Sequence, residues 1–228
     1  MNQIDRIRQK LELLREADKD LTLFGADTHK YELHPPLMPD KLRQFEQEHG
    51  ISLPEQYFQF LTELGNGGAG PFYGLHPLET GHILFYDSSE HAAHTLYELN
   101  KPFPYTEPWN VMDELSELYE QIDAAVESGN VELEEMLCDK KHDLTGAPEN
   151  DHGRLEISDY GCGIRITLVV NGAAKGEVWT DDRANDGGIY PSTELGNEAR
   201  LGFFDWYERW LDNGMEELKE KGSLNTKL

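Results

Sequence analysis

The chain has few cysteines, few basic residues and no long apolar run, and each shortage narrows what it can be. Two cysteines in 228 residues cannot form a disulfide framework, and no CxxC pair indicates a structural metal site. No apolar run approaches the length of a bilayer span, and the polar N-terminus lacks the apolar core of a secretory signal. These absences predict a cytoplasmic protein that does not interact with membranes.

The shortage of basic residues leaves a large negative charge. Twenty Lys and Arg oppose 44 Asp and Glu, which gives a formal net charge of −24. Such a charge repels nucleic acid phosphates and anionic membranes and attracts basic partners. Two interpretations remain open at this point: a surface that only maintains solubility, or a surface that binds a specific basic protein.

Candidate catalytic motifs are incomplete. The glycine-rich stretch 65–70 lacks the GK[ST] ending of a phosphate loop and follows a predicted helix, whereas a phosphate cradle needs amides at a helix N-terminus. It is better explained as a helix exit and sharp turn. Cys162 lies between two glycines, and the base nearest in sequence is His152. We therefore predict no catalytic residues, with a cysteine or metal enzyme as the alternative.

Candidate metal ligands are also incomplete. His91 and His94 have helical spacing but no evident third ligand. The acidic stretch 181–186 departs from the EF-hand spacing and has no closing glutamate, so Asx-turn chemistry explains it better. The sequence predicts no metal and no cofactor.

Apolar periodicity predicts several helices outside the most acidic region. Residues at spacings of three and four predict an amphipathic N-terminal helix over about 2–17. A second helix is expected to be capped by Asp40 and to end at Gly50. A third should begin near Leu53 or Ser52 and stop at Gly65, and a fourth covers His91 to Leu99. A late helix carries an aromatic face from Phe203 to Leu211, and Gly214 is expected to end it. The apolar positions that define the first helix are Ile4, Ile7, Leu11 and Leu14.

The most acidic region is predicted to be a helical hairpin inserted over about 107–145. Between Glu107 and Asp159 there are 16 acidic residues and three basic ones. Ser128-Gly129-Asn130 separates two helical patterns, whose apolar positions are Val111, Leu115, Leu118, Tyr119, Ile122 and Val126 in the first and Val131, Leu133, Met136 and Leu137 in the second. Clustered carboxylates attract basic partners. We predict a partner-binding surface formed by Asp113, Glu117, Glu120, Asp123, Glu134 and Glu135, with a merely solvated face as the alternative.

Strand patterns dominate the second half. Arg154 to Asp159, Ile164 to Val170 and Glu177 to Trp179 read as strands, and Asn171-Gly172 is a reverse-turn signal between two of them. One or two further strands are predicted within Pro71 to Phe85, and Asp181 to Gly188 is expected to be a loop. The predicted fold class is α+β, with a central, mostly antiparallel sheet and helices packed around it.

Several motifs in order resemble the SUKH superfamily, which contains bacterial toxin-immunity proteins and fungal cell-wall assembly regulators. The resemblance covers roughly residues 38–212. It is carried by Leu53-Pro54, Tyr57, Phe60-Leu61, Gly65-Asn66-Gly67-Gly68, Gly70-Pro71, Gly74-Leu75, Asp159-Tyr160-Gly161-Cys162-Gly163, Asn171-Gly172, Gly176, Val178-Trp179, Asp181, Gly188 and the helix with Trp206.

This resemblance implies a single SUKH-like domain over residues 1–228 that acts by binding. It implies that the partner is a cognate protein toxin, often a nuclease, and that no catalytic residues are needed. Nuclease toxins have basic clefts for phosphates, so an acidic protein could compete there as a charge mimic. The fungal members imply the alternative, an intracellular scaffold or regulatory binding module.

Overall fold

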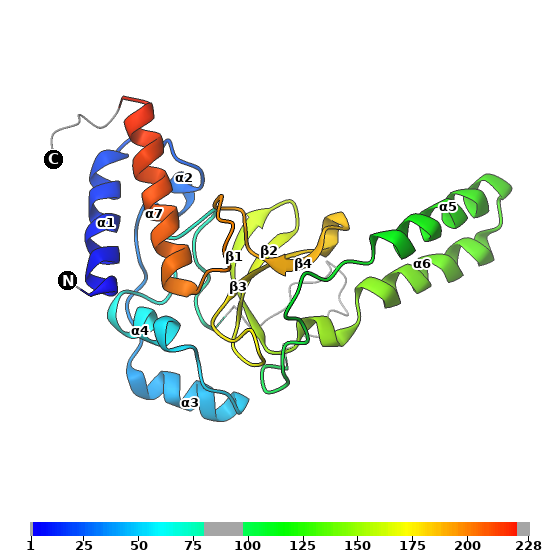
Figure 1. The fold of residues 1–228 in the computed structure, drawn as a ribbon, viewed down its shortest axis with the longest axis horizontal. Helices are drawn as coiled ribbons and strands as arrows, with labels where there is room; N and C mark the ends of the chain where they lie inside the picture. The colour runs from blue at the N-terminus through cyan, green and yellow to red at the C-terminus, as the bar shows by residue number, and fades with distance from the viewer. Residues whose placement is uncertain (1, 80–97, 223–228) are drawn as a thin grey trace.

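The computed structural model describes residues 2–79 and 98–222. Helices lie on both sides of a small central sheet, and a long helical hairpin projects from one end of the molecule (Figure 1). The α+β prediction is confirmed. Along the chain the elements are α1 (Gln3–Ala17), α2 (Ala26–His29), α3 (Pro39–His49), α4 (Glu55–Glu63), α5 (Met112–Ser128), α6 (Val131–Thr145), η1 (Pro148–Asp151), β1 (Arg154–Gly161), β2 (Ile164–Val169), β3 (Val178–Asp182), η2 (Arg183–Asn185), β4 (Gly188–Pro191) and α7 (Phe203–Glu220).

The sheet is an antiparallel meander in the order β1-β2-β3-β4. Because side chains alternate across a strand, its two faces carry different residues. One face contributes Leu155, Ile166 and Leu168 to the main core beneath the helices. The other face contributes Val169 and Trp179 to a smaller cluster. The second face is the one on which the polar network described below is built.

The predicted N-terminal helix is confirmed as α1, and it packs against the C-terminal helix α7. The four predicted apolar positions of α1 are all buried. Lys10 also bridges two carboxylates of α7, at 2.8 Å from Glu208 and 2.6 Å from Asp212. The prediction that Gly214 ends the late helix is wrong. Gly214 lies inside α7, where a Cβ would meet Leu14 side-chain atoms at 3.2 Å, so the missing side chain allows close helix packing instead.

Helix boundaries near the prolines differ slightly from expectation. Asp40 is inside α3 rather than capping it, because Pro39 occupies the first turn and Met38 is the cap residue. Pro54 caps α4, one residue after Leu53 and two after Ser52. The predicted end of α3 holds, since Gly50 adopts the left-handed conformation there, and α4 ends at Glu63, two residues before the predicted Gly65.

The predicted strand near Pro71 is wrong where the structure describes it. Phe72 and Gly74 have φ of +58° and +99°, so this segment turns instead of extending. Leu75 makes only isolated bridges, to Gly68 and Ser158. Three predictions lie outside the described residues: the rest of this strand region, nearly all of the 91–99 helix, and the pair of His91 and His94.

The loop predicted after Trp179 is also partly wrong. Asp181 and Asp182 end β3, and Gly188 begins a short strand, β4, which the sequence patterns did not indicate. This strand pairs with β3 on one side. On its other side the Ile189 and Trp109 backbones exchange two hydrogen bonds of 2.8 Å. Trp109 lies just before α5, so the pairing fixes the start of the projecting hairpin to the sheet.

Gly188 makes this pairing possible. Its φ is +83°, and a Cβ there would lie 2.1 Å from the Trp109 carbonyl oxygen. We expect Gly188→Ala to lower the free energy of unfolding by more than about 2 kcal/mol, because left-handed strain adds to the loss of two backbone hydrogen bonds. Urea denaturation measures the change.

Gly129→Ala is the matched control. Gly129 also has a positive φ, +67°, but a Cβ there meets nothing within 4 Å. Its substitution should cost only the backbone strain, about 1 kcal/mol. Equal losses for the two variants would show that the close approach of Trp109 and Gly188 contributes nothing to stability.

Candidate partner-binding surface

The predicted acidic insert is a hairpin of two antiparallel helices, α5 and α6. Its own small core consists of Leu118, Ala125 and Leu137, with Ile122 packed against them. Gly129 adopts a left-handed conformation between the helices, and the Asn130 side chain accepts a hydrogen bond from the Leu133 amide. The break predicted at residues 128–130 is therefore confirmed in position.

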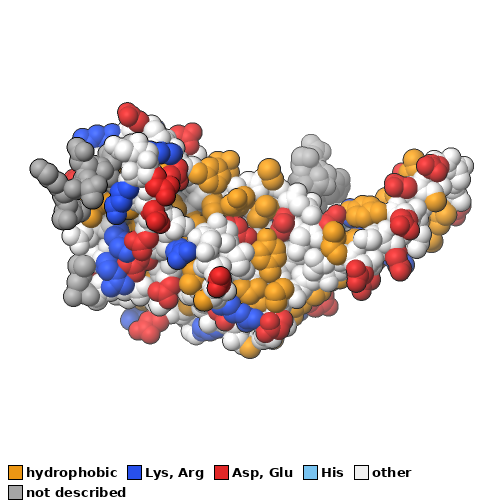
Figure 2. Space-filling view, turned by 45° about the horizontal axis from the view of Figure 1, so that its top comes forward, with side chains coloured by type: hydrophobic (Ala, Val, Ile, Leu, Met, Phe, Trp, Pro, Cys, Tyr) orange, Lys and Arg blue, Asp and Glu red, His pale blue; other side chains and the backbone are white. Residues whose placement is uncertain are grey.

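The apolar face predicted for α6 is mostly uncovered. Leu137 is buried, but Val131 and Met136 are 60% and 58% exposed, and Leu133 is also exposed. On α5, Met112 and Val126 are exposed as well. Figure 2 shows hydrophobic side chains between acidic ones along the hairpin. Because a two-helix arm has only one internal seam, the apolar residues beyond that seam remain available for contact with another molecule.

The six predicted carboxylates do not form one patch. Asp113, Glu117, Glu120 and Asp123 are exposed on the outer side of α5. Glu135 is exposed on α6, about 160° around the helix from the buried Leu137, so it points away from α5. The remaining residue, Glu134, is only half-exposed. The structure therefore favours the α5 row as the larger acidic surface.

These carboxylates carry unneutralised charge. Within residues 2–79 and 98–222, none of the six forms an ion pair. The two helices together contain 11 acidic and two basic residues. Like charges three or four positions apart, such as Asp113 and Glu117, destabilise a helix by about 0.2–0.5 kcal/mol per pair. A basic partner would relieve this repulsion.

The two lysines of the hairpin have different surroundings. The Lys141 ammonium lies 4.4 Å from the centre of the Tyr119 ring. Lys140 lines an open groove of about 400 Å³ between the two helices, together with Glu114, Glu117 and Asp143. Three carboxylates beside one ammonium leave this groove negative, which suits a cationic side chain.

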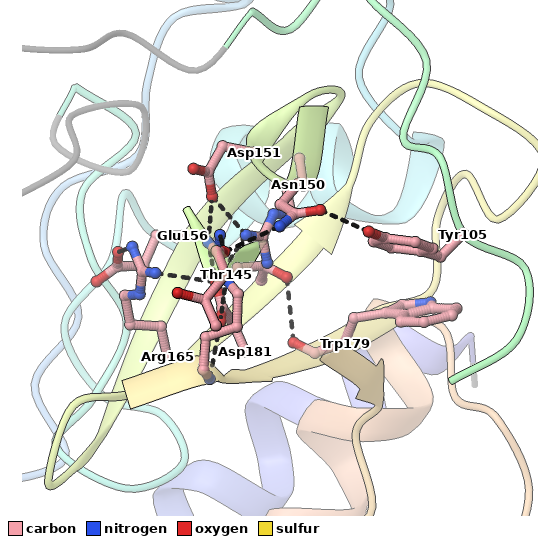
Figure 3. A network of polar contacts seen from close by, with 11 residues as sticks. Tyr105, Thr145, Asn150, Asp151, Glu156, Arg165, Trp179 and Asp181 are labelled. Carbon is pink, nitrogen blue, oxygen red and sulfur yellow. Dashed lines mark hydrogen bonds and ion pairs between the residues drawn. The ribbon is translucent and has the colours of Figure 1, made fainter. Parts of the chain in front are cut away.

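A buried charge network secures the base of the hairpin to the sheet (Figure 3). Asp181, on β3, accepts hydrogen bonds from three arginines at 2.7–2.9 Å: Arg154, Arg165 and Arg183. Asp151, in η1, accepts from Arg154 and Arg183 at 2.6 Å. The side chains of Asp181 and Arg154 are fully buried. Glu156 lies 4.0 Å from Arg165, so three guanidinium groups face three carboxylates.

The network reaches the hairpin through the end of α6. Arg183 donates a hydrogen bond of 3.0 Å to the Thr145 carbonyl oxygen, and the Asn150 amide donates another of 3.0 Å to the same oxygen. A separate contact holds α5, since the Tyr119 hydroxyl donates to Asp186 at 2.7 Å. Both helices are thus fixed at their base, while their outer surfaces stay free.

Burial and the arginines act on Asp181 in opposite directions. Burial would raise the pKa of the Asp181 carboxyl, but Arg154, Arg183 and Arg165 outweigh it and hold that pKa far below its ordinary range. Because the folded-state pKa is depressed, the stability from ionised Asp181 is present above the ordinary aspartate pKa and is lost only in strong acid. The network therefore stays intact across physiological pH.

The weaker candidate sites identified in the sequence have structural explanations. Asp181 accepts hydrogen bonds from arginines and is not free to bind a metal ion. No group of His, Cys, Asp and Glu side chains that could hold a metal occurs among the described residues. His152 contacts Glu98 at 3.1 Å, and Cys162 occupies the exposed turn between β1 and β2. The glycine-rich segment pairs with the chain that follows it, since the Gly68 and Leu75 amides donate hydrogen bonds to each other's carbonyl oxygens.

Comparison with known proteins identifies no relative. No family model, no curated protein and no solved structure matches the chain. None of the described helices is long and apolar enough to cross a bilayer. The function must therefore be inferred from the surface described above.

The network predicts that a single conservative substitution, Asp181→Asn, strongly destabilises the fold. Asp181→Asn leaves three buried or half-buried guanidinium groups without their shared carboxylate, so we expect it to lower the free energy of unfolding by about 3–5 kcal/mol. Chemical denaturation measures the loss. Hydrogen exchange should also accelerate near Thr145, because Arg183 would lose its two charge-assisted hydrogen bonds to Asp181 and keep the one to Asp151.

An exposed ion pair supplies the control. Glu12 and Arg15 are 53% and 51% exposed and lie 2.6 Å apart. Glu12→Gln should change the free energy of unfolding by less than about 0.5 kcal/mol. A loss as small as this for Asp181→Asn would contradict a stabilising role for the network.

Proposed function

We propose that this protein is an immunity-type binding protein that neutralises a cognate, basic toxin of the nuclease kind through the acidic hairpin. The observation that carries the proposal is a projecting arm with 11 acidic side chains and two basic ones. The SUKH-like motifs support the same class. The protein would act in the cytoplasm, where a nuclease meets its substrate, and by binding rather than by catalysis.

The physical basis is competition for a phosphate-binding cleft. A nuclease cleft is positive because it binds a polyanion, and a narrow acidic arm can enter it where a flat surface cannot. The row of Asp113, Glu117 and Glu120 lies on one side of α5, with three- and four-residue spacing along the helix. Exposed apolar side chains such as Met136 and Val131 would add contact area that charge alone does not provide.

Reversing the α5 row tests the proposal. We expect the triple variant Asp113→Lys, Glu117→Lys, Glu120→Lys to bind the cognate toxin at least about tenfold more slowly at low salt, because steering by opposite charge is lost. Stopped-flow association measured across ionic strengths should show a flatter salt dependence than the unmodified protein. The variant should also fail to protect nucleic acid from the toxin.

A second triple variant controls for net charge. Glu16, Glu48 and Glu216 are exposed carboxylates on α1, α3 and α7, away from the hairpin. Their replacement by lysine changes the total charge equally and should leave most of the association rate intact. Equal slowing by both variants would mean that total charge alone matters. Binding without inhibition of the nuclease would instead favour the scaffold alternative.

A further inference from the structure

A small aromatic groove lies at the end of the molecule away from the hairpin. Its volume is about 200 Å³, and it is formed by the segment before α2, the turn after α4, the end of β1, the loop after β4 and part of α7. Figure 1 shows α2 and α7 on one side of the sheet and the hairpin on the other. The lining residues that matter here are Phe24, Phe72, Tyr160, Trp210, Glu194 and Glu217.

Three of these rings, those of Phe24, Phe72 and Tyr160, form a continuous cluster, in which Phe72 is buried and Phe24 reaches solvent. The Phe72 and Tyr160 rings lie 4.7 Å apart, and Phe24 lies 6.1 Å from Tyr160. Phe24 is 52% exposed and meets Tyr73, itself 45% exposed, edge to face at 5.2 Å. Adjacent aromatic side chains left this exposed are typical of contact sites rather than of a protein's ordinary surface.

Two carboxylates line the groove, and one of them, Glu194, has no ion-pair partner within the described parts of the chain. Glu194 is held in position, since its Oε2 accepts hydrogen bonds from the Ser192 hydroxyl at 2.6 Å and the Thr193 amide at 2.9 Å. Glu217 pairs with Lys221 at 2.6 Å, but both side chains remain about half exposed. The groove therefore combines π faces with a fixed carboxylate.

We propose that this groove binds an arginine side chain presented by a protein partner. A guanidinium group stacks on aromatic faces and also donates paired hydrogen bonds to a carboxylate, and both features are present here. The groove is smaller than the roughly 300–1,000 Å³ of small-molecule sites, which favours one inserted side chain over a whole ligand. A second copy of this chain is disfavoured as the partner, because its net charge of −24 repels its own kind.

This inference does not depend on the toxin proposal. The groove and the hairpin use different residues on different elements, so a partner could engage either one alone. A test on the groove therefore needs only a small arginine probe and the intact protein.

The probe is the capped tripeptide acetyl-Gly-Arg-Gly-amide, titrated into the isotope-labelled protein and followed by NMR. We expect shifts in the backbone signals of Phe24, Glu194 and Leu195 and in the Trp210 indole N–H. The matching citrulline peptide has the same shape without the charge, and should bind at least about tenfold more weakly. A lysine peptide should also bind more weakly, because its ammonium cannot stack as a plane.

Three variants complete the experiment. Phe24→Ala removes a half-exposed ring, and Glu194→Gln removes the charge while keeping a hydrogen-bond acceptor, so each should weaken arginine binding about tenfold. Met38→Ala, at a residue 68% exposed elsewhere on the surface, should change nothing. Absence of shifts, equal binding of citrulline, tighter binding of lysine, or full affinity in both groove variants would each overturn the proposal.

Discussion

Neutralisation of Asp181 by three arginines is the interaction on which the arrangement of the molecule depends. Its members come from β1, β2, β3 and the turns on either side of them, so it joins the sheet to the end of α6. A buried carboxylate without partners would be protonated or would destabilise the fold, and a buried guanidinium would be worse. The charged groups can stay buried only while they are paired with one another, so their relative positions are tightly constrained. That constraint fixes the direction in which the hairpin leaves the sheet.

The same network leaves the hairpin acidic. Two cations near its base, Arg154 and Arg183, are directed inward to Asp181 and Asp151. Lys10 is occupied at the other end, between α1 and α7. The carboxylates on the outer side of α5 therefore have no ion-pair partner among the described residues. The arm is held at its base and its like charges repel one another along its length, which is the physical basis of our proposal that it binds a positive partner.

Local patterns were predictable and long-range pairings were not. The spacing of Ile4, Ile7, Leu11 and Leu14 identified α1 because helical period is a property of neighbouring residues. The hairpin and its break at Gly129 followed from the same logic. The pattern could not show that Val131 and Met136 would lack cover, because exposure depends on what packs against them. For the same reason the local pattern predicts a helix end at Gly214, whereas in the structure the missing side chain lets Leu14 pack closely against α7.

The charge network around Asp181 depends on long-range pairings that local sequence patterns do not predict. Arg165 and Asp181 are direct cross-strand partners, but only the register of β2 and β3 reveals this. Period-two alternation was the available signal, since it places Arg165, Thr167 and Val169 on one face. Without the register, Asp181 belonged to an acidic stretch that resembled an incomplete calcium loop. The aromatic groove had no local signal at all, because its residues come from segments that meet only in the fold.

The two proposed surfaces differ in range, and this difference decides what each can contribute. Charges act over about 8 Å at physiological ionic strength, so the projecting hairpin can orient a basic partner before contact. Stacking of a guanidinium on Phe24 requires contact distances, so the groove cannot influence approach. The hairpin would therefore control the association rate and its salt dependence, whereas the groove would control dissociation. If one partner spans both ends, salt should weaken its capture much more than it shortens the lifetime of the complex.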